Sequence, residues 1–175
     1  MSARLCEQMT TQKQNKEIPL IEIVKAEEKH VSAIGQLWLE FIRFHQDIDP
    51  IFTPLDDAVQ GFKEEMVHTL MKSEDGLVLV ALDGEQVVGY SISEIKEPPK
   101  GANRDKYGYI HHMAVTASYR RTGIGEKMFD EIMKWFRLKN VDRIELEITS
   151  KNIVSDSFWQ KHGFTDYQRI LYRQI

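Results

Sequence analysis

The segment 113–126, MAVTASYRRTGIGE, constrains the fold strongly because a strand pattern passes there directly into a helix pattern. The turn between them carries Arg120, Arg121, Gly123 and Gly125. The first backbone amides of a helix have no internal acceptor, and the helix dipole favours negative charge at that end. Glycines let a ligand approach the backbone closely. The segment therefore predicts a strand-turn-helix unit with a phosphate-type anion site at its turn.

Two better-known phosphate loops do not fit this turn. The Rossmann fingerprint needs a third glycine where Met128 stands. The P-loop needs a lysine and a serine or threonine after its last glycine, whereas Glu126 follows Gly125.

Hydrophobic periodicity and chain breakers divide the rest of the sequence into short elements. Strands are predicted at 20–24, 77–82, 87–95, 107–115, 141–148 and 164–175, and helices at 27–44, 56–71, 123–138 and 152–162. Asp49-Pro50 and Pro54 separate the first two helices, and Asp83-Gly84 marks a hairpin turn. The order β-α-α-β-β-β-α-β-α-β predicts an α/β (α+β) fold, with a mixed sheet and helices on both faces.

The 175 residues suffice for one domain, which we assign to residues 18–175 after a polar appendage at 1–17. The longest apolar run, 77–82, is far shorter than the roughly 20 residues of a membrane helix, so we expect no membrane span. The start of the sequence lacks the features of a secretory signal, and Cys6 has no partner for an internal disulfide. These features predict a cytoplasmic location.

The formal net charge of −4 argues against a surface devoted to nucleic acid, and we expect no such partner. Acidic residues predominate at 45–75 and basic residues at 118–143. This division suits a cationic ligand on one side and an anionic ligand on the other, or else two ordinary solvated helix surfaces.

Two sequence blocks resemble motifs of the GNAT superfamily of N-acetyltransferases. The first is Arg120-Arg121-Thr122-Gly123-Ile124-Gly125, which is similar to the family's pyrophosphate motif R-x-x-G-x-G. The second consists of Asn152, then Phe158-Trp159, then Gly163-Phe164, and is similar to N-x-x-A-x-x-F-Y-x-x-x-G-F. The resemblance covers residues 18–175 and implies the GNAT fold, with a mixed, mostly antiparallel sheet.

The resemblance also implies an acetyl-CoA cosubstrate and a site for it. Residues of three kinds would contribute: the pyrophosphate turn with Arg120, Arg121, Thr122, Gly123, Ile124, Gly125 and Glu126; the strand backbone of Met113, Ala114 and Val115, along the pantetheine arm; and Asn152, Phe158 and Trp159. Homodimers are a family expectation.

Three positions depart from the family pattern. Ala117 replaces a common proline, Ser155 replaces a common alanine, and Trp159 replaces the tyrosine that protonates the departing thiolate in many relatives. An indole N–H is not a useful acid. The resemblance implies a direct acetyl transfer in a ternary complex. The missing tyrosine motivates the alternative, a non-catalytic acyl-CoA-binding module.

A general base has three candidates. Relatives place their base on the strand 107–115, at positions that match Tyr109 and His111, and His111 is preferred because imidazole titrates in the right range. Glu94, on the neighbouring strand, is the second choice. Strand alternation puts Tyr109, His111 and Met113 on one face and His112 and Ala114 on the other, so we expect no metal site at the histidine pair.

The acceptor side is predicted in the connection between the first two helices. Phe44, His45, Asp49 and Phe52 lie where the fold usually forms its acceptor pocket, and carboxylates with aromatic rings suit a cation. The expected acceptor is a primary amine of a small molecule or a peptide. The loop 96–106 is either a lid over this pocket or an ordinary hairpin excursion.

Overall fold

The computed structural model describes residues 20–173. The predicted appendage at 1–17, with Cys6, lies outside this range. No helix in the described range is long and apolar enough to cross a membrane.

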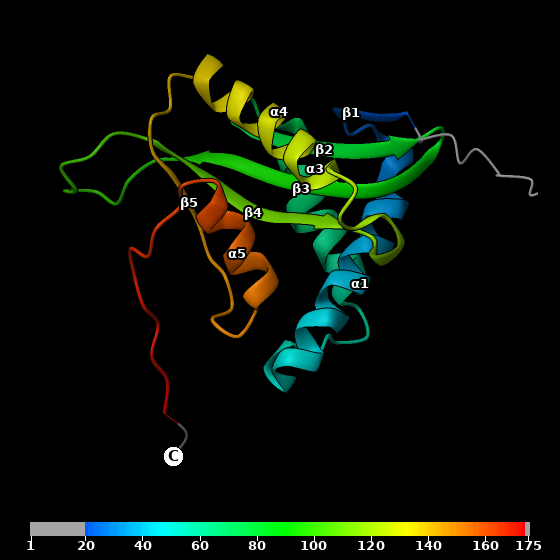
Figure 1. The fold of residues 1–175 in the computed structure, drawn as a ribbon. Coiled ribbons are helices and arrows are strands. Elements are labelled where there is room, and N and C mark those ends of the chain that lie inside the picture. The colour runs from blue at the N-terminus through cyan, green and yellow to red at the C-terminus, as the bar shows by residue number, and fades with distance from the viewer. Residues whose placement is uncertain (1–19, 174–175) are drawn as a thin grey trace, which may run out of the picture.

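A single five-stranded sheet organises the molecule (Figure 1). Its strands are β1 (Ile21–Lys25), β2 (Gly76–Asp83), β3 (Gln86–Lys96), β4 (Tyr107–Val115) and β5 (Ile144–Leu146), in the spatial order β1-β2-β3-β4-β5. The first four pair antiparallel, whereas β5 runs parallel to β4. The predicted mixed, mostly antiparallel sheet is therefore confirmed.

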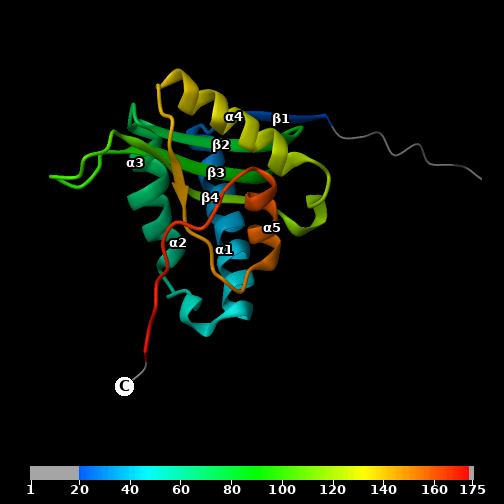
Figure 2. The same cartoon turned by 60° about the vertical axis from the view of Figure 1, so that its left-hand side comes forward.

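Helices cover both faces of this sheet (Figures 1 and 2). On one face lie α1 (Val31–Ile48), α2 (Ala58–Gly61), a π-helical segment (Phe62–Val67) and α3 (His68–Lys72); on the other lie α4 (Ile124–Leu138) and α5 (Ile153–Lys161). Short 3-10 turns occupy Glu28–His30, Pro50–Phe52 and Ala117–Tyr119. Helix α1 continues four residues past its predicted end and stops at Asp49-Pro50, because proline lacks the amide that a helix needs.

The two helical layers create two apolar cores. Strand β2 is buried on both faces, as its continuous apolar run indicates. Val78 and Val80 join the core under α1, whereas Leu77 and Leu79 join the core under α4. A smaller third cluster, around Met128, lies at the start of α4.

The predicted strand at 164–175 is wrong over the residues that the structure describes. Phe164 packs against Phe129 and Trp159, but residues 165–173 form no strand and are exposed. Their pattern favours a strand, yet a strand also needs a neighbour that offers free backbone groups. The segment instead runs away from the sheet (Figures 1 and 2).

Strand β4 contains a bulge at His111. The β3–β4 register moves from Ile92↔His112 to Ser93↔Ile110, so His111 has no partner across the pair. One extra residue of this kind reverses the alternation of faces beyond it. The predicted sharing of faces is therefore wrong at three positions: His112 and Ala114 lie on the face of α1 with Tyr109 and His111, and Met113 packs in the cores on the face of α4.

His112 is packed among aromatic side chains. Its ring centroid lies 5.1 Å from Phe41, 5.6 Å from Phe62 and 6.2 Å from Tyr90, and its Nδ1 is buried without a hydrogen-bond partner in the described residues. Burial lowers the pKa of His112 to about 4, with smaller contributions from nearby His111 and His45.

We expect acid to destabilise the protein through His112. Between about pH 6.5 and pH 4 the unfolded imidazole takes up a proton that the folded one does not, so stability falls with pH, by up to about 3 kcal/mol from this residue. Urea unfolding of the wild type and His112→Phe at pH 7.5, 6 and 4.5 measures the effect. Equal losses in both proteins would contradict the assignment.

Gly108 is required where β4 passes under α4. A Cβ at this position would lie 2.5 Å from the Phe136 ring, which is fully buried. We expect Gly108→Ala to lower the free energy of unfolding by about 1–3 kcal/mol through overpacking. Gly61→Ala is the control, because its Cβ would meet nothing within 4 Å and alanine favours a helix. Equal unfolding midpoints for the two variants would disprove the clash.

Candidate active site

The turn between β4 and α4 forms a concave group of free backbone amides. Arg121 and Gly123 both have positive φ, 66° and 86°, and such left-handed residues make adjacent N–H groups converge. Within the described residues, no amide of residues 121–126 donates to a backbone carbonyl, whereas the Lys127 amide bonds Gly123 O at 3.1 Å. The predicted strand-turn-helix unit is present, and its donors are available to an anion.

Both glycines of the turn leave space beside the backbone. A Cβ on Gly123 would meet nothing within 4 Å, and one on Gly125 would meet only the Phe158 ring, at 3.5 Å. Phe158 thus closes one side of the turn. A ligand can reach these amides because neither position carries a side chain.

The two arginines of the turn lie differently. Arg120 is folded back: its Nε donates to Val115 O at 3.0 Å, and its guanidinium lies 3.4 Å from Glu40 and over the Phe44 ring at 5.4 Å. The Glu40 carboxylate therefore partly neutralises the charge of Arg120. Arg121 is exposed.

Glu40 of α1 is a site residue that the sequence analysis missed. Its carboxylate accepts hydrogen bonds from Thr116 Oγ1 at 2.8 Å and from the Ala117 amide at 2.9 Å. These bonds fix the start of the turn against α1. Nothing local signals this role, because more than 70 residues separate Glu40 from its partners.

The other turn residues are anchored as well. Thr122 Oγ1 donates to Tyr119 O at 2.6 Å, and Tyr119 Oη donates to Asp83 at 2.6 Å. Glu126 pairs with Lys161 of α5, and this hydrogen bond is the main reason that the pKa of Glu126 is lowered. Ile124 is buried beneath the turn. The free groups of the turn are thus its backbone amides, and most of its side chains hold that backbone in place.

The three candidate acid-base residues lie together on the α1 face of the sheet. His111 Nε2 is 2.7 Å from Glu94 Oε1, and Lys96 Nζ is 3.3 Å from the same oxygen. Lys96 also lies 3.8 Å from the centre of the Tyr109 ring, which is 4.8 Å from the His111 ring. With the Nε2 proton donated to the carboxylate, Nδ1 of His111 keeps the lone pair that can accept a proton.

The surroundings set the protonation of this cluster. Burial lowers the pKa of His111, and the Glu94 carboxylate opposes that shift. Burial, followed by the nearby Glu147 carboxylate, raises the pKa of Tyr109 to about 12. At neutral pH, His111 is therefore an uncharged imidazole, and Tyr109 is a protonated phenol that can donate a hydrogen bond. Glu147 was not singled out from sequence, because its approach to Tyr109 depends on the pairing of β4 with β5.

Asn152 is buried and doubly fixed at the start of α5. Its Oδ1 accepts the Ser155 amide at 3.1 Å, and its Nδ2 lies 3.3 Å from His45 Nε2. His45 is buried in turn, and its Nδ1 donates to Phe41 O at 2.9 Å. The structure therefore places His45 behind Asn152, where its ring is not accessible to an amine substrate.

The remaining predicted acceptor residues lie at the end of α1. Asp49 caps the next 3-10 turn by accepting the Ile51 amide at 3.2 Å, and this bond is the main reason that its pKa is lowered. Lys151 lies 3.4 Å from the same carboxylate. Phe52 packs its edge against His45, with ring centroids 5.6 Å apart. The cluster thus joins α1 to α5.

Trp159 belongs to the core. The side chain is buried, and its Nε1 donates to Ser155 Oγ at 3.1 Å. Two of the three departures from the family pattern are therefore partners of each other. The indole has no donor left for a departing group.

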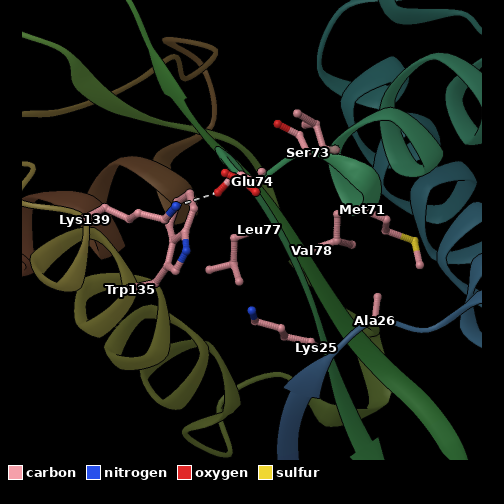
Figure 3. A pocket seen from close by; sticks show the side chains of 11 residues that line it. Lys25, Ala26, Met71, Ser73, Glu74, Leu77, Val78, Trp135 and Lys139 are labelled. Atoms are coloured by element: carbon pink, nitrogen blue, oxygen red, sulfur yellow. Dashed lines mark hydrogen bonds between the residues drawn. The ribbon is translucent and has the colours of Figure 1, made fainter.

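Two hollows open at different places on the surface. One, of about 370 Å³, lies beside the turn and is lined by Glu40, Phe44 and Arg120, among others. The other, of about 270 Å³, lies at the far end of α4, beside Trp135 (Figure 3). Lys139, which lines it, donates to Glu74 O at 2.7 Å. None of the predicted site residues lines this second hollow.

Over residues 20–173, no group of three or more His, Cys, Asp or Glu side chains could hold a metal ion.

Two curated proteins share part of this sequence. A chloroplastic GCN5-related N-acetyltransferase 6 of Arabidopsis thaliana is 33% identical over 81 residues, or 46% of this chain. An N-alpha-acetyltransferase of Sulfurisphaera tokodaii is 30% identical over 108 residues, or 57% of this chain. The matched regions span 27% and 62%, respectively, of the lengths of these relatives.

Solved structures share the fold. A predicted acetyltransferase from Clostridium acetobutylicum, solved with acetyl-CoA, superposes with a TM-score of 0.69 at 21% identity, over 89% of this chain and 96% of that one. Residues 38–164 match the acetyltransferase (GNAT) family. This match spans most of the sequence and includes both the open turn and the His111–Glu94 pair, so the chain belongs to the acetyltransferase (GNAT) family.

Proposed function

We propose that residues 18–175 form an N-acetyltransferase that moves the acetyl group of acetyl-CoA directly to a primary amine in a ternary complex. One observation carries the proposal: β4 ends in a turn of free amides and carries in its middle His111, which is half-buried and paired with Glu94 of β3. At about 3.3 Å per residue, Val115 lies roughly 13 Å along the strand from His111. An extended pantetheine arm spans that distance.

The residues of the turn fit the cosubstrate. Amides of residues 121–126 would bind the pyrophosphate, and the absence of side chains at Gly123 and Gly125 leaves room for it. The backbone of Met113, Ala114 and Val115 would pair with the pantetheine arm, next to the fixed amide of Asn152. Phe158 and Trp159 would support this wall by packing.

His111 would act as the general base. The amine nitrogen attacks the thioester carbon, a C–N bond forms, and the C–S bond breaks. His111 Nδ1 takes a proton from the amine, while Glu94 holds the ring and stabilises the imidazolium. Tyr109 remains protonated at neutral pH, so it serves as a hydrogen-bond donor, and the released thiolate recovers its proton through water or from the amine.

The acceptor would approach on the side of α1. Phe44 lines the hollow beside the turn, and Asp49 and Phe52 lie at the end of the same helix. Carboxylates and aromatic rings there suit an ammonium group. His45 would contribute only indirectly, by fixing the side chain of Asn152.

A non-catalytic acyl-CoA-binding module is the second candidate, and the packing of Trp159 favours it, because no acid stands at that position. Both candidates bind acetyl-CoA, so turnover separates them. Release of CoASH should be measured with polyamines, amino acids, aminoglycosides and peptide amines. Turnover with any of these amines supports the enzyme; stabilisation by acetyl-CoA without turnover across the panel supports the module.

The turn should be essential for cosubstrate binding. We expect Gly125→Val to reduce acetyl-CoA affinity at least tenfold, because its side chain fills the space beside the amides while the fold tolerates it at 3.5 Å from Phe158. Calorimetry and thermal unfolding measure affinity and folding. Gly61→Val is the matched control, since its side chain also meets open space but lies far along the chain. Unchanged affinity in folded Gly125→Val would refute the assignment.

If His111 is the general base, the dependence of kcat/KM on pH should reveal it. His111→Ala should lower kcat/KM by roughly 10², with partial recovery at high pH, where the amine deprotonates unaided. In the wild type, kcat/KM should fall as pH drops through the lowered pKa of His111. Because the Glu94 charge raises that pKa, Glu94→Gln should move the acidic limb to lower pH. His68→Ala, on α3, is the control, and an unmoved limb in Glu94→Gln would exclude this pairing.

A further inference from the structure

Glu126 brings a negative charge into the turn of free amides. Gly123 is the N-cap residue of α4, and Glu126 is the third residue of that helix. Side chains of a helix lean toward its N-terminus, so the Glu126 side chain starts beside the free amides of the turn. A glutamate at this helical position often reaches back and accepts the N-cap amide. The turn therefore contains a carboxylate that is able to compete with a phosphate-type ligand for the same donors.

The structure shows this carboxylate turned toward α5 instead. Its Oε1 accepts a hydrogen bond from Lys161 Nζ, and within residues 20–173 it has no other hydrogen-bond or ion-pair partner. This bond is the main reason that the pKa of Glu126 is lowered, so the carboxylate is charged at neutral pH. In the same part of the chain, the Gly123 amide donates to no backbone carbonyl. The pairing with Lys161 thus leaves the N-cap amide open.

Packing between the two helices holds Lys161 at this place. Phe158 and Lys161 lie three residues apart, on one face of α5. The Phe158 ring lies 6.4 Å from the Phe129 ring of α4, and a Cβ on Gly125 would meet it at 3.5 Å. Lys161 therefore faces the first turn of α4, next to the contact between Phe158 and Gly125.

The ion pair itself contributes little to the stability of the fold. The Lys161 side chain is 66% exposed, and that of Glu126 is 48% exposed. Water and salt screen ion pairs that are this exposed. The main effect of the pair falls on the turn, because it sets the direction that the Glu126 carboxylate takes.

We propose that Lys161 is a positioning residue for the acetyl-CoA site: it holds the Glu126 carboxylate away from the amides of the turn. The inference rests on the proposed acetyl-CoA site, and Lys161 acts there through Glu126 rather than on the pyrophosphate itself. In the paired state, the two charges cancel and the amides of residues 121–126 remain open. Without Lys161, the carboxylate bonds the Gly123 amide and repels the pyrophosphate.

The other cationic groups around the turn do not replace Lys161. Arg120 is paired with Glu40 of α1, on the opposite side of the turn. His162 is packed among aromatic rings and makes no hydrogen bond to Glu126. Lys161 is therefore the cation whose loss would release the carboxylate.

Calorimetric measurement of acetyl-CoA affinity tests this role. We expect Lys161→Met to weaken binding roughly fivefold or more, because the unpaired carboxylate repels the pyrophosphate and takes its donors. Lys161→Arg should retain the affinity, since it keeps the charge. Thermal unfolding checks that both variants fold. Lys134→Met is the control, because it breaks an exposed ion pair with Glu131 farther along α4 and should leave the affinity unchanged.

Removal of Glu126 separates this role from a direct contact. We expect Lys161→Met combined with Glu126→Ala to bind acetyl-CoA as tightly as the wild type, since no carboxylate is left to compete. A double variant as weak as Lys161→Met would show that Lys161 contacts the ligand or supports the fold, and would overturn the proposal. Unchanged affinity in Lys161→Met would overturn it as well but leave the acetyl-CoA site standing. A wild type that does not bind acetyl-CoA would overturn the site and this inference together.

Discussion

The extra residue in β4 determines how the site is built. Because His111 has no partner across β3, the strand presents His111 to Glu94 and still turns His112 toward α1 and Met113 toward α4. A regular strand would have placed either the base or two core residues on the wrong face. The bulge therefore allows one short strand to hold a polar pair and serve two apolar cores.

The turn at the end of the same strand depends on contacts from far along the chain. Glu40 fixes its beginning from α1, Asp83 holds Tyr119 from the β2–β3 hairpin, and Lys161 of α5 neutralises Glu126. These side chains keep the amides of residues 121–126 oriented, and this preorganisation lowers the cost of ordering the turn when an anion binds.

Local features of the sequence were enough to predict most of the fold. The β4–α4 unit, the hairpin at Asp83-Gly84 and the end of α1 at Asp49-Pro50 follow from turn chemistry and periodicity within a few residues. The grouping of Glu94, Tyr109 and His111 also follows from the pairing of neighbouring strands. The roles of Glu40, His45 and Glu147 could not be predicted, because each depends on a contact between distant segments. The strand at 164–175 failed for a related reason: sequence pattern shows that a segment can pair, but not that a partner edge is within reach.

The contact between Trp159 and Ser155 gives two of the three departures from the family pattern a common physical cause. An indole is larger than a phenol and brings an N–H that needs an acceptor when buried. Ser155, one helical turn earlier, provides that acceptor, whereas an alanine there would leave the N–H unpaired. The packing is thus satisfied, and a proton donor at this position is lost. The polar groups that remain near the middle of β4 are a neutral imidazole that can accept a proton and a phenol that stays protonated. Under the proposed mechanism, the rate of acetyl transfer would depend on removing a proton from the amine, and the thiolate, being a weak base, could leave without an acid beside it.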